Sequence, residues 1–230
     1  GQILVTNLAF EYQYAVREWL GIYTEVALRA RTGTDGPSLF RDGVAYGTAF
    51  EVGWLVQMRE TERSLLSGSL YLANRDVSFI DPFGFVEEIV EGRPAEFTET
   101  IPSLRMGTAA HYAIAFNRVV GAFATGTVSF GESLQERDTD WLFGLTAGVS
   151  LDLESEGVPI GLALSGRADD DASPIGVANG PWEAVGLRVT YTRPTDMQLS
   201  LVSTINSVPF TERTDMIVYE VGVEMRYYFF

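Results

Sequence analysis

The segment Ile217–Phe229, IVYEVGVEMRYYF, decides the fold. Its odd positions are all apolar or aromatic, whereas the even positions include Glu220, Glu224 and Arg226. A period of two is that of a β-strand with one apolar and one polar face. Because the same alternation recurs along the chain, we predict an all-β fold.

Ten further stretches show this alternation, near residues 4–16, 20–28, 44–56, 64–74, 104–116, 120–130, 141–151, 160–167, 185–191 and 197–206. A strand of about ten residues can cross a bilayer at a tilt. Short connections alternate with long ones, the long ones falling near 32–43, 75–102, 131–140, 168–181 and 206–215. This pattern predicts one domain, residues 1–230, built as an up-and-down antiparallel β-barrel.

The composition excludes several classes of protein. The 230 residues carry a net charge of −15, no cysteine and no lysine, so all 16 basic residues are arginines. Without cysteine there is no disulfide framework or thiolate site, and the acidic balance argues against nucleic acid as a partner. The lack of lysine indicates that little of the chain faces bulk water. Since the sequence opens at Gly1 without a leader, we expect a signal peptide to have been removed.

Three features indicate that the apolar face points outward, to lipid. The polar face is rich in Gly, Ala, Ser and Thr, which suits a crowded lumen. Aromatic residues lie toward the strand ends, as in interfacial belts. A barrel of eleven or twelve strands is also too wide for one layer of apolar side chains to fill. A soluble barrel or sandwich is the alternative.

The chain therefore resembles the outer-membrane β-barrel proteins of Gram-negative bacteria, a porin-like class. The resemblance rests on the repeated amphipathic strands, the alternating connections and the aromatic-ended final strand from Val218 to Phe230. It implies a transmembrane barrel in the bacterial outer membrane, in contact with its lipid. The sequence departs from this class at its last residue. The apolar face of the final strand consists of odd-numbered residues up to Phe229, so Phe230 falls on the face expected to point into the lumen.

The resemblance also implies an even number of strands, because both termini of such barrels usually lie on the short-turn side. Eleven strands would put Gly1 at the long-loop end. Either one strand lies upstream of Gly1, or the number of strands near 75–100 differs from that indicated by the alternation; we expect twelve strands in the complete barrel.

A set of charged residues has lumen parity and is expected to line the interior. Glu25, Glu51, His111, Arg188 and Glu224 would share a middle layer, with Arg29 and Arg105 nearer the long loops and Arg226 on the last strand. Opposed carboxylates and guanidinium groups in a narrow lumen should pair, because an isolated charge there is costly. The layer is either a constriction that filters solutes by charge or a network that rigidifies the barrel.

Other candidate sites carry weaker signals. His111 is the one histidine and has no nearby serine in sequence, so we expect a hydrogen-bonded lumen residue and no catalytic site. Asp169, Asp170 and Asp171 lack the spacing of a calcium loop, so we expect a solvated acidic run, no metal and no cofactor. A short helix over about 81–91 would carry Phe83, Phe85, Val86 and Ile89, either as a lid or packed on the rim.

These observations favour a transport protein, a narrow outer-membrane pore or binding channel for small solutes. Excess acid at the loops would favour cations. The alternative is a non-conducting barrel that anchors or scaffolds an outer-membrane assembly, with protein partners at the long loops. We expect no enzyme activity.

Overall fold

The computed structural model describes residues 3–33, 44–80, 89–90, 98–132, 139–170, 182–193, 196–211 and 214–229. These residues form eleven strands, each with the alternating pattern seen in the sequence. The strands are β1 (Ile3–Arg17), β2 (Leu20–Gly33), β3 (Val44–Glu60), β4 (Ser64–Ile80), β5 (Thr98–Ala115), β6 (Val120–Glu132), β7 (Thr139–Asp152), β8 (Ile160–Asp169), β9 (Trp182–Tyr191), β10 (Met197–Thr211) and β11 (Thr214–Phe229).

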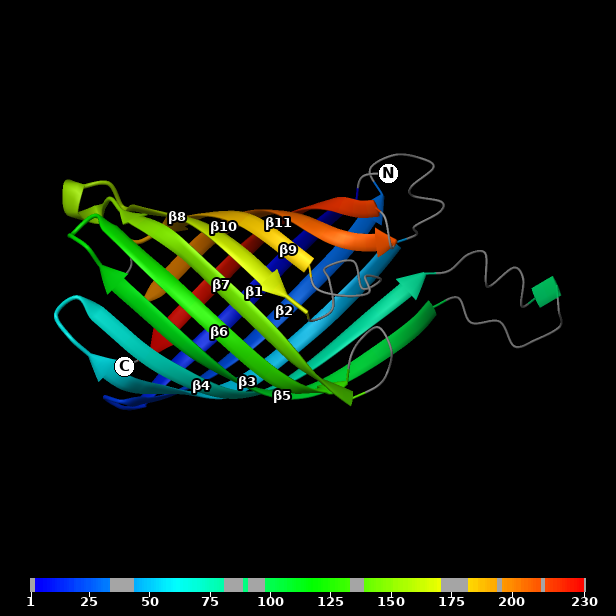
Figure 1. The fold of residues 1–230 in the computed structure, drawn as a ribbon, viewed down its shortest axis with the longest axis horizontal. Helices are drawn as coiled ribbons and strands as arrows, with labels where there is room; N and C mark the ends of the chain where they lie inside the picture. Colours follow the sequence, from blue (N-terminus) through cyan, green and yellow to red (C-terminus); the bar gives the residue numbers. More distant parts are fainter. Residues whose placement is uncertain are drawn as a thin grey trace.

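The eleven strands close into one barrel, which confirms the predicted all-β class (Figure 1). Strands that follow one another in the chain pair antiparallel, and β1 pairs with β11 in parallel, for example at Leu8 and Val223. The two chain ends lie at opposite ends of the barrel in Figure 1. A twelfth strand is not among the described residues. None of the described helical segments is long and apolar enough to span a membrane.

The strands at the long-loop end extend farther than the sequence predicts. β4 continues to Ile80 and β5 begins at Thr98, so both enter the segment 75–102 that was expected to be a loop. β10 and β11 likewise occupy most of 206–215. The alternation fades there because outward positions become polar, as at Asn74 and Asp76, although the backbone pairing continues.

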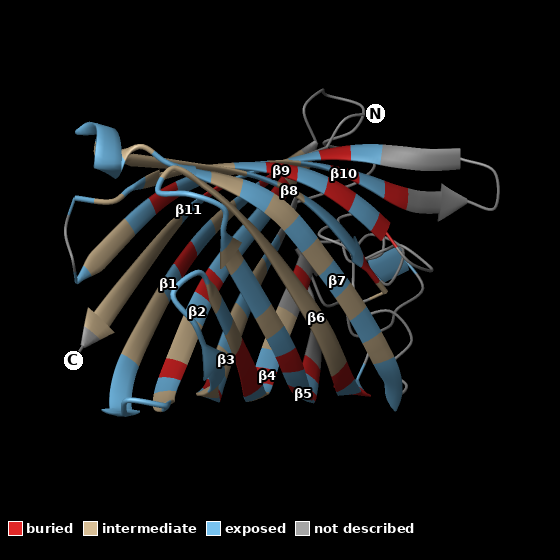
Figure 2. Ribbon diagram, turned by 60° about the vertical axis from the view of Figure 1, so that its left-hand side comes forward, coloured by how far each residue is buried: buried red, intermediate tan, exposed pale blue. Residues whose placement is uncertain are grey.

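The distribution of burial is inverted with respect to a soluble protein. Leu8, Leu145, Leu164 and Leu201 on four different strands are 52–59% exposed, and Figure 2 shows exposed and buried positions alternating along the strands. The buried apolar residues are mostly small and have lumen parity. One inner cluster lies beside the β1–β11 pairing and consists of Val5, Trp182, Ala184, Val208 and Val218.

Aromatic rings inside the barrel lie against glycines of neighbouring strands. Tyr23 is paired with Gly53, and Phe123 is paired with Gly148. A Cβ atom at either glycine would come within 2.7 Å of the partner's ring. The missing side chain therefore makes the space that each ring occupies, which fixes the rings flat along the wall.

Turns at the short-turn end are tight. Between β7 and β8 a single turn of 3-10 helix, η1 (Glu154–Glu156), ends at Gly157, whose φ of +84° lies in the left-handed region. Asn117 caps the β5–β6 turn, because its Oδ1 accepts hydrogen bonds from the backbone of Val119 and Val120, both at 2.8 Å.

Candidate functional site

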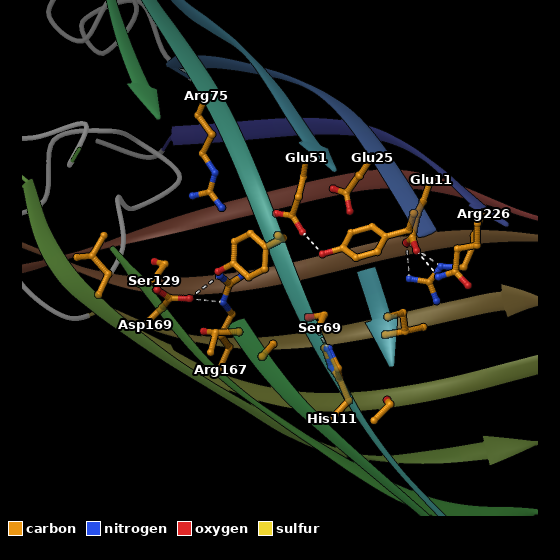
Figure 3. Close-up of a pocket in the computed structure, with 18 of the residues that line it drawn as sticks. Glu11, Glu25, Glu51, Ser69, Arg75, His111, Ser129, Arg167, Asp169 and Arg226 are labelled. Atoms are coloured by element: carbon orange, nitrogen blue, oxygen red, sulfur yellow. Dashed lines mark hydrogen bonds and ion pairs between the residues drawn. The ribbon is translucent and has the colours of Figure 1, made fainter. Parts of the chain in front are cut away.

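One row of charged side chains crosses four neighbouring strands on the lumen face. Arg226 on β11 is in register with Glu11 on β1, Glu11 with Glu25 on β2, and Glu25 with Glu51 on β3. Residues directly opposite across strands have Cβ atoms about 5 Å apart. The row therefore places three carboxylates side by side on one wall, with one guanidinium group at its end (Figure 3).

Arg226 and Arg188 each form an ion pair with a lumen carboxylate. The Nη2 atom of Arg226 lies 2.6 Å from Oε2 of Glu11, and its Nε donates to the same oxygen at 2.7 Å. Arg188 holds Glu224 through two contacts, Nη1 to Oε2 at 2.8 Å and Nη2 to Oε1 at 3.2 Å. The arginine on β9 thus reaches across β10 to β11 and ties three strands together.

The other two carboxylates of the row are held differently. Glu51 accepts a hydrogen bond of 2.6 Å from the phenol of Tyr23 and interacts electrostatically with Arg75. Glu25 has electrostatic neighbours, among them Glu11, Glu51 and Arg226. Within the described part of the chain it forms no hydrogen bond or ion pair, which makes it the available carboxylate of the wall.

His111 lies between two hydroxyl groups. Its Nε2 is 3.2 Å from Oγ of Ser69 and its Nδ1 is 3.2 Å from Oγ1 of Thr125. Sequence analysis missed Ser69, because the serine comes from the neighbouring strand β4. A neutral imidazole can donate to one hydroxyl and accept from the other, so this geometry satisfies the ring completely.

Two further arginines lie outside the acidic row: Arg167 on β8, on the opposite wall, and Arg105 on β5. Arg167 donates from Nε to Oδ2 of Asp169 at 3.0 Å, and its guanidinium group lies 5.0 Å from the ring centre of Trp182. The carboxylate and the ring hold the guanidinium in one place. Arg105 lies farther toward the long-loop end, 2% exposed, where its Nε donates to the backbone oxygen of Glu132 at 2.9 Å.

Three cavities follow one another in the lumen. The middle one has a volume of about 410 Å³ and is lined by the acidic row, Tyr71, His111 and Arg75, among others. It adjoins a cavity of about 190 Å³ at the short-turn end. A third, of about 370 Å³, lies among Arg29, Arg188 and Glu224. The middle and third cavities have three lining residues in common, Glu25, Arg75 and Arg167.

The predicted charge layer is thus spread over the length of the lumen. Four of its members line the middle cavity, namely Glu25, Glu51, His111 and Arg226. Arg29, Arg188, Glu224 and again Glu25 line the third. Sequence analysis did not single out Glu11, Tyr23, Arg75 or Arg167. All four have lumen parity, and the strand register is the signal that brings them together.

The two remaining predictions fall largely outside the described residues. Phe83, Phe85 and Val86 are not described, whereas Ile89 is helical and 55% exposed. Of the acidic run, Asp169 is buried against Arg167 and Asp170 accepts a hydrogen bond from the backbone of Phe143. Asp171 is not described. Among the residues that are, no three His, Asp or Glu side chains are grouped to hold a metal ion.

Comparison with known proteins found no matching family model and no matching curated protein.

Proposed function

We propose that this barrel spans the bacterial outer membrane and acts as a narrow channel or binding site for small solutes. The observation that carries the proposal is the inverted burial: large apolar side chains cover the outside and charged groups lie within. Among the described outward positions, charged side chains lie near the two rims, at Asp76, Glu132 and Glu183 toward the long-loop end and at Arg17 and Arg59 beside the short turns. A surface of this kind suits hydrocarbon.

Aromatic residues at two levels support the same proposal. Trp19, Trp54 and Phe116 are exposed near the short-turn end, and Tyr46 and Trp141 are exposed near the other. Tyr46 and Trp54 lie eight residues apart on β3, which is about 26 Å along the strand. For a strand tilted by ~40° from the barrel axis, this is about 20 Å along that axis. This spacing is close to the apolar band of ~25 Å in outer-membrane barrels.

The cavities support passage or binding of polar solutes. Carboxylates and arginines are nearly balanced at the lumen-facing positions, so the interior itself does not set a preference for cations. About half of the net charge of −15 lies in the segments that connect strands at the long-loop end: 34–43, 81–97, 133–138 and 170–181 carry −1, −4, −1 and −2, together −8. We propose that this mouth attracts cations and that the lumen then selects among small solutes.

Single-channel recording in a planar bilayer tests the proposal. The refolded protein should produce discrete conductance steps in KCl, with a reversal potential in a salt gradient that favours K⁺. A correctly folded barrel that inserts but never conducts would contradict the channel and support the alternative, a barrel that anchors an outer-membrane assembly. Because both nitrogens of His111 face hydroxyl groups, with no carboxylate bonded to the ring among the described residues, we propose no enzymatic role.

A barrel of twelve strands is a further proposal. The added strand would be antiparallel to both neighbours and would separate β1 from β11, which pair directly in the present structure. It would also bring both ends of the barrel chain to the short-turn side.

A further inference from the structure

The three residues common to the middle and third cavities form the boundary between them. Glu25 projects from β2 and Arg75 from β4, on either side of β3, and Arg167 projects from β8 on the far side of the lumen. A solute that occupies one cavity or moves to the other passes these three side chains. We call them the junction.

The junction carries both signs of charge in fixed places. Figure 3 shows Arg75 beside the carboxylates of Glu51 and Glu25, on the strand next to that of Glu51, and Arg167 across the cavity from them. Arg167 is held by Asp169 and Trp182, and the hydrogen bonds to Asp169 use only its Nε and Nη2. Of its five N–H groups, several stay available to a ligand.

The charges of the junction define the chemistry of the ligand. Glu25 offers a carboxylate without a hydrogen-bonding partner in the described residues, which suits an ammonium group. Two guanidinium groups offer donors in the fork geometry that binds carboxylates. A solute with one charge would meet repulsion from the opposite wall, and an uncharged solute would leave the carboxylate of Glu25 without a bonded cation.

We propose that the junction binds small zwitterions that carry an ammonium and a carboxylate group on a short skeleton, as free amino acids do. The ammonium group is bound by Glu25 and the carboxylate group by Arg75 and Arg167. Cavities of about 410 and 370 Å³ are within the range of ~300–1,000 Å³ that is usual for small-molecule sites. This inference rests on the proposed function and names its solute class.

The fluorescence of Trp182 can report binding at the junction. It lines the third cavity beside Arg167, whereas the other three tryptophans, Trp19, Trp54 and Trp141, are 52–58% exposed. Replacing these three by Phe leaves Trp182 as the one fluorescent indole. The probes are L-glutamine, its amide L-glutaminamide, which keeps only the ammonium group, and N-acetyl-L-glutamine, which keeps only the carboxylate.

Titrations of the folded barrel in detergent micelles should show L-glutamine binding at least about tenfold more tightly than either analogue. Glu25→Gln should abolish the advantage over N-acetyl-L-glutamine, and Arg75→Gln should reduce the advantage over L-glutaminamide. Arg167→Lys should keep part of the binding, since the charge remains. Asp152→Asn, which removes a carboxylate at the short-turn end that lines none of the three cavities, should leave the ranking unchanged. Far-UV circular dichroism verifies that each variant is folded.

Equal affinities for the three probes, or an unchanged ranking in folded Glu25→Gln, would overturn the inference. Conductance in KCl is measured on the same preparations. A barrel that conducts but binds the three probes equally refutes zwitterion recognition alone. A barrel that ranks the probes as expected but never conducts refutes the channel and leaves the binding site standing.

Discussion

The phenol ring of Tyr23 lies against Gly53 of the neighbouring strand, so close that a Cβ atom at residue 53 would be 2.7 Å from its Cε1. The same ring donates a hydrogen bond to Glu51, two residues away on that strand. The glycine therefore sets the position of the phenol and, through it, that of a carboxylate of the acidic row.

Replacement of this glycine should destabilise the barrel. We expect Gly53→Ala to lower the free energy of unfolding by about 1–3 kcal/mol, because the ring and the nearby backbone oxygen of Leu70 leave no room for a methyl group. Gly126→Ala is the matched control, since a Cβ there meets nothing within 4 Å, and its effect should stay within about 0.5 kcal/mol. Urea unfolding in lipid vesicles measures both. Equal effects would show that Tyr23 is not confined by the glycine.

The ion pair between Arg226 and Glu11 should respond unequally to loss of its two members. Arg226→Gln leaves Glu11 without its ion pair beside the carboxylates of Glu25 and Glu51, whereas Glu11→Gln also removes one of the acids. We expect a loss of about 1–3 kcal/mol for Arg226→Gln and less for Glu11→Gln, given that the arginine is 38% exposed and partly screened. Thermal unfolding of both single variants and the double variant measures the coupling. A larger loss for Glu11→Gln would contradict the repulsive row.

A charge placed on the outer face distinguishes a lipid-facing surface from a solvated one. Leu201 is 53% exposed in the middle of β10. If it faces hydrocarbon, Leu201→Arg should cost about 2–4 kcal/mol, whereas an exposed site in water would tolerate the change within about 0.5 kcal/mol. Leu201→Ala controls for the lost side chain. Unfolding of the three proteins in lipid vesicles decides the matter, and an arginine variant as stable as the alanine variant would argue against membrane insertion.

Opposite changes of lumen charge should shift ion selectivity in opposite directions. Glu51→Gln removes a negative charge from the middle cavity, and Arg188→Gln removes a positive charge from the third. The ratio of K⁺ to Cl⁻ permeability should fall in the first and rise in the second, by on the order of fivefold for a charge within several ångströms of the path. Reversal potentials in a salt gradient give the ratio. Identical shifts in both variants would mean that ions do not pass these groups.

Cysteine pairs test the number of strands, because the chain has no cysteine of its own. Leu8 is paired with Val223 across the parallel closure and with Leu28 across the β1–β2 ladder. We expect the double variant Leu8→Cys with Leu28→Cys to cross-link in any barrel. Leu8→Cys with Val223→Cys should cross-link only if β1 and β11 are neighbours, since an inserted strand would separate the two Cα atoms by about 10 Å. Non-reducing electrophoresis after oxidation measures the disulfide cross-link in both double variants.

The sequence predicts the strands well because a period of two is a local property. All eleven were located from alternation alone, and several ends were misplaced, notably at the long-loop end where outward positions turn polar, as at Asp76. The site was harder to predict, because contacts between strands depend on register. Arg188 and Glu224 are 36 residues apart and Tyr23 and Glu51 are 28 apart. Parity indicates that such residues face the lumen but cannot say which of them meet.

The parallel pairing of the first and last strands has a consequence for the order of folding. Ten ladders join strands that follow one another in the chain, so they can form progressively as hairpins. The eleventh joins residues such as Glu11 and Arg226, which are 215 positions apart. Closing so long a loop is slow and comes late. Before closure the chain is a curved open sheet with two unpaired edges, and those edges are where aggregation, or capture by a folding helper, would begin.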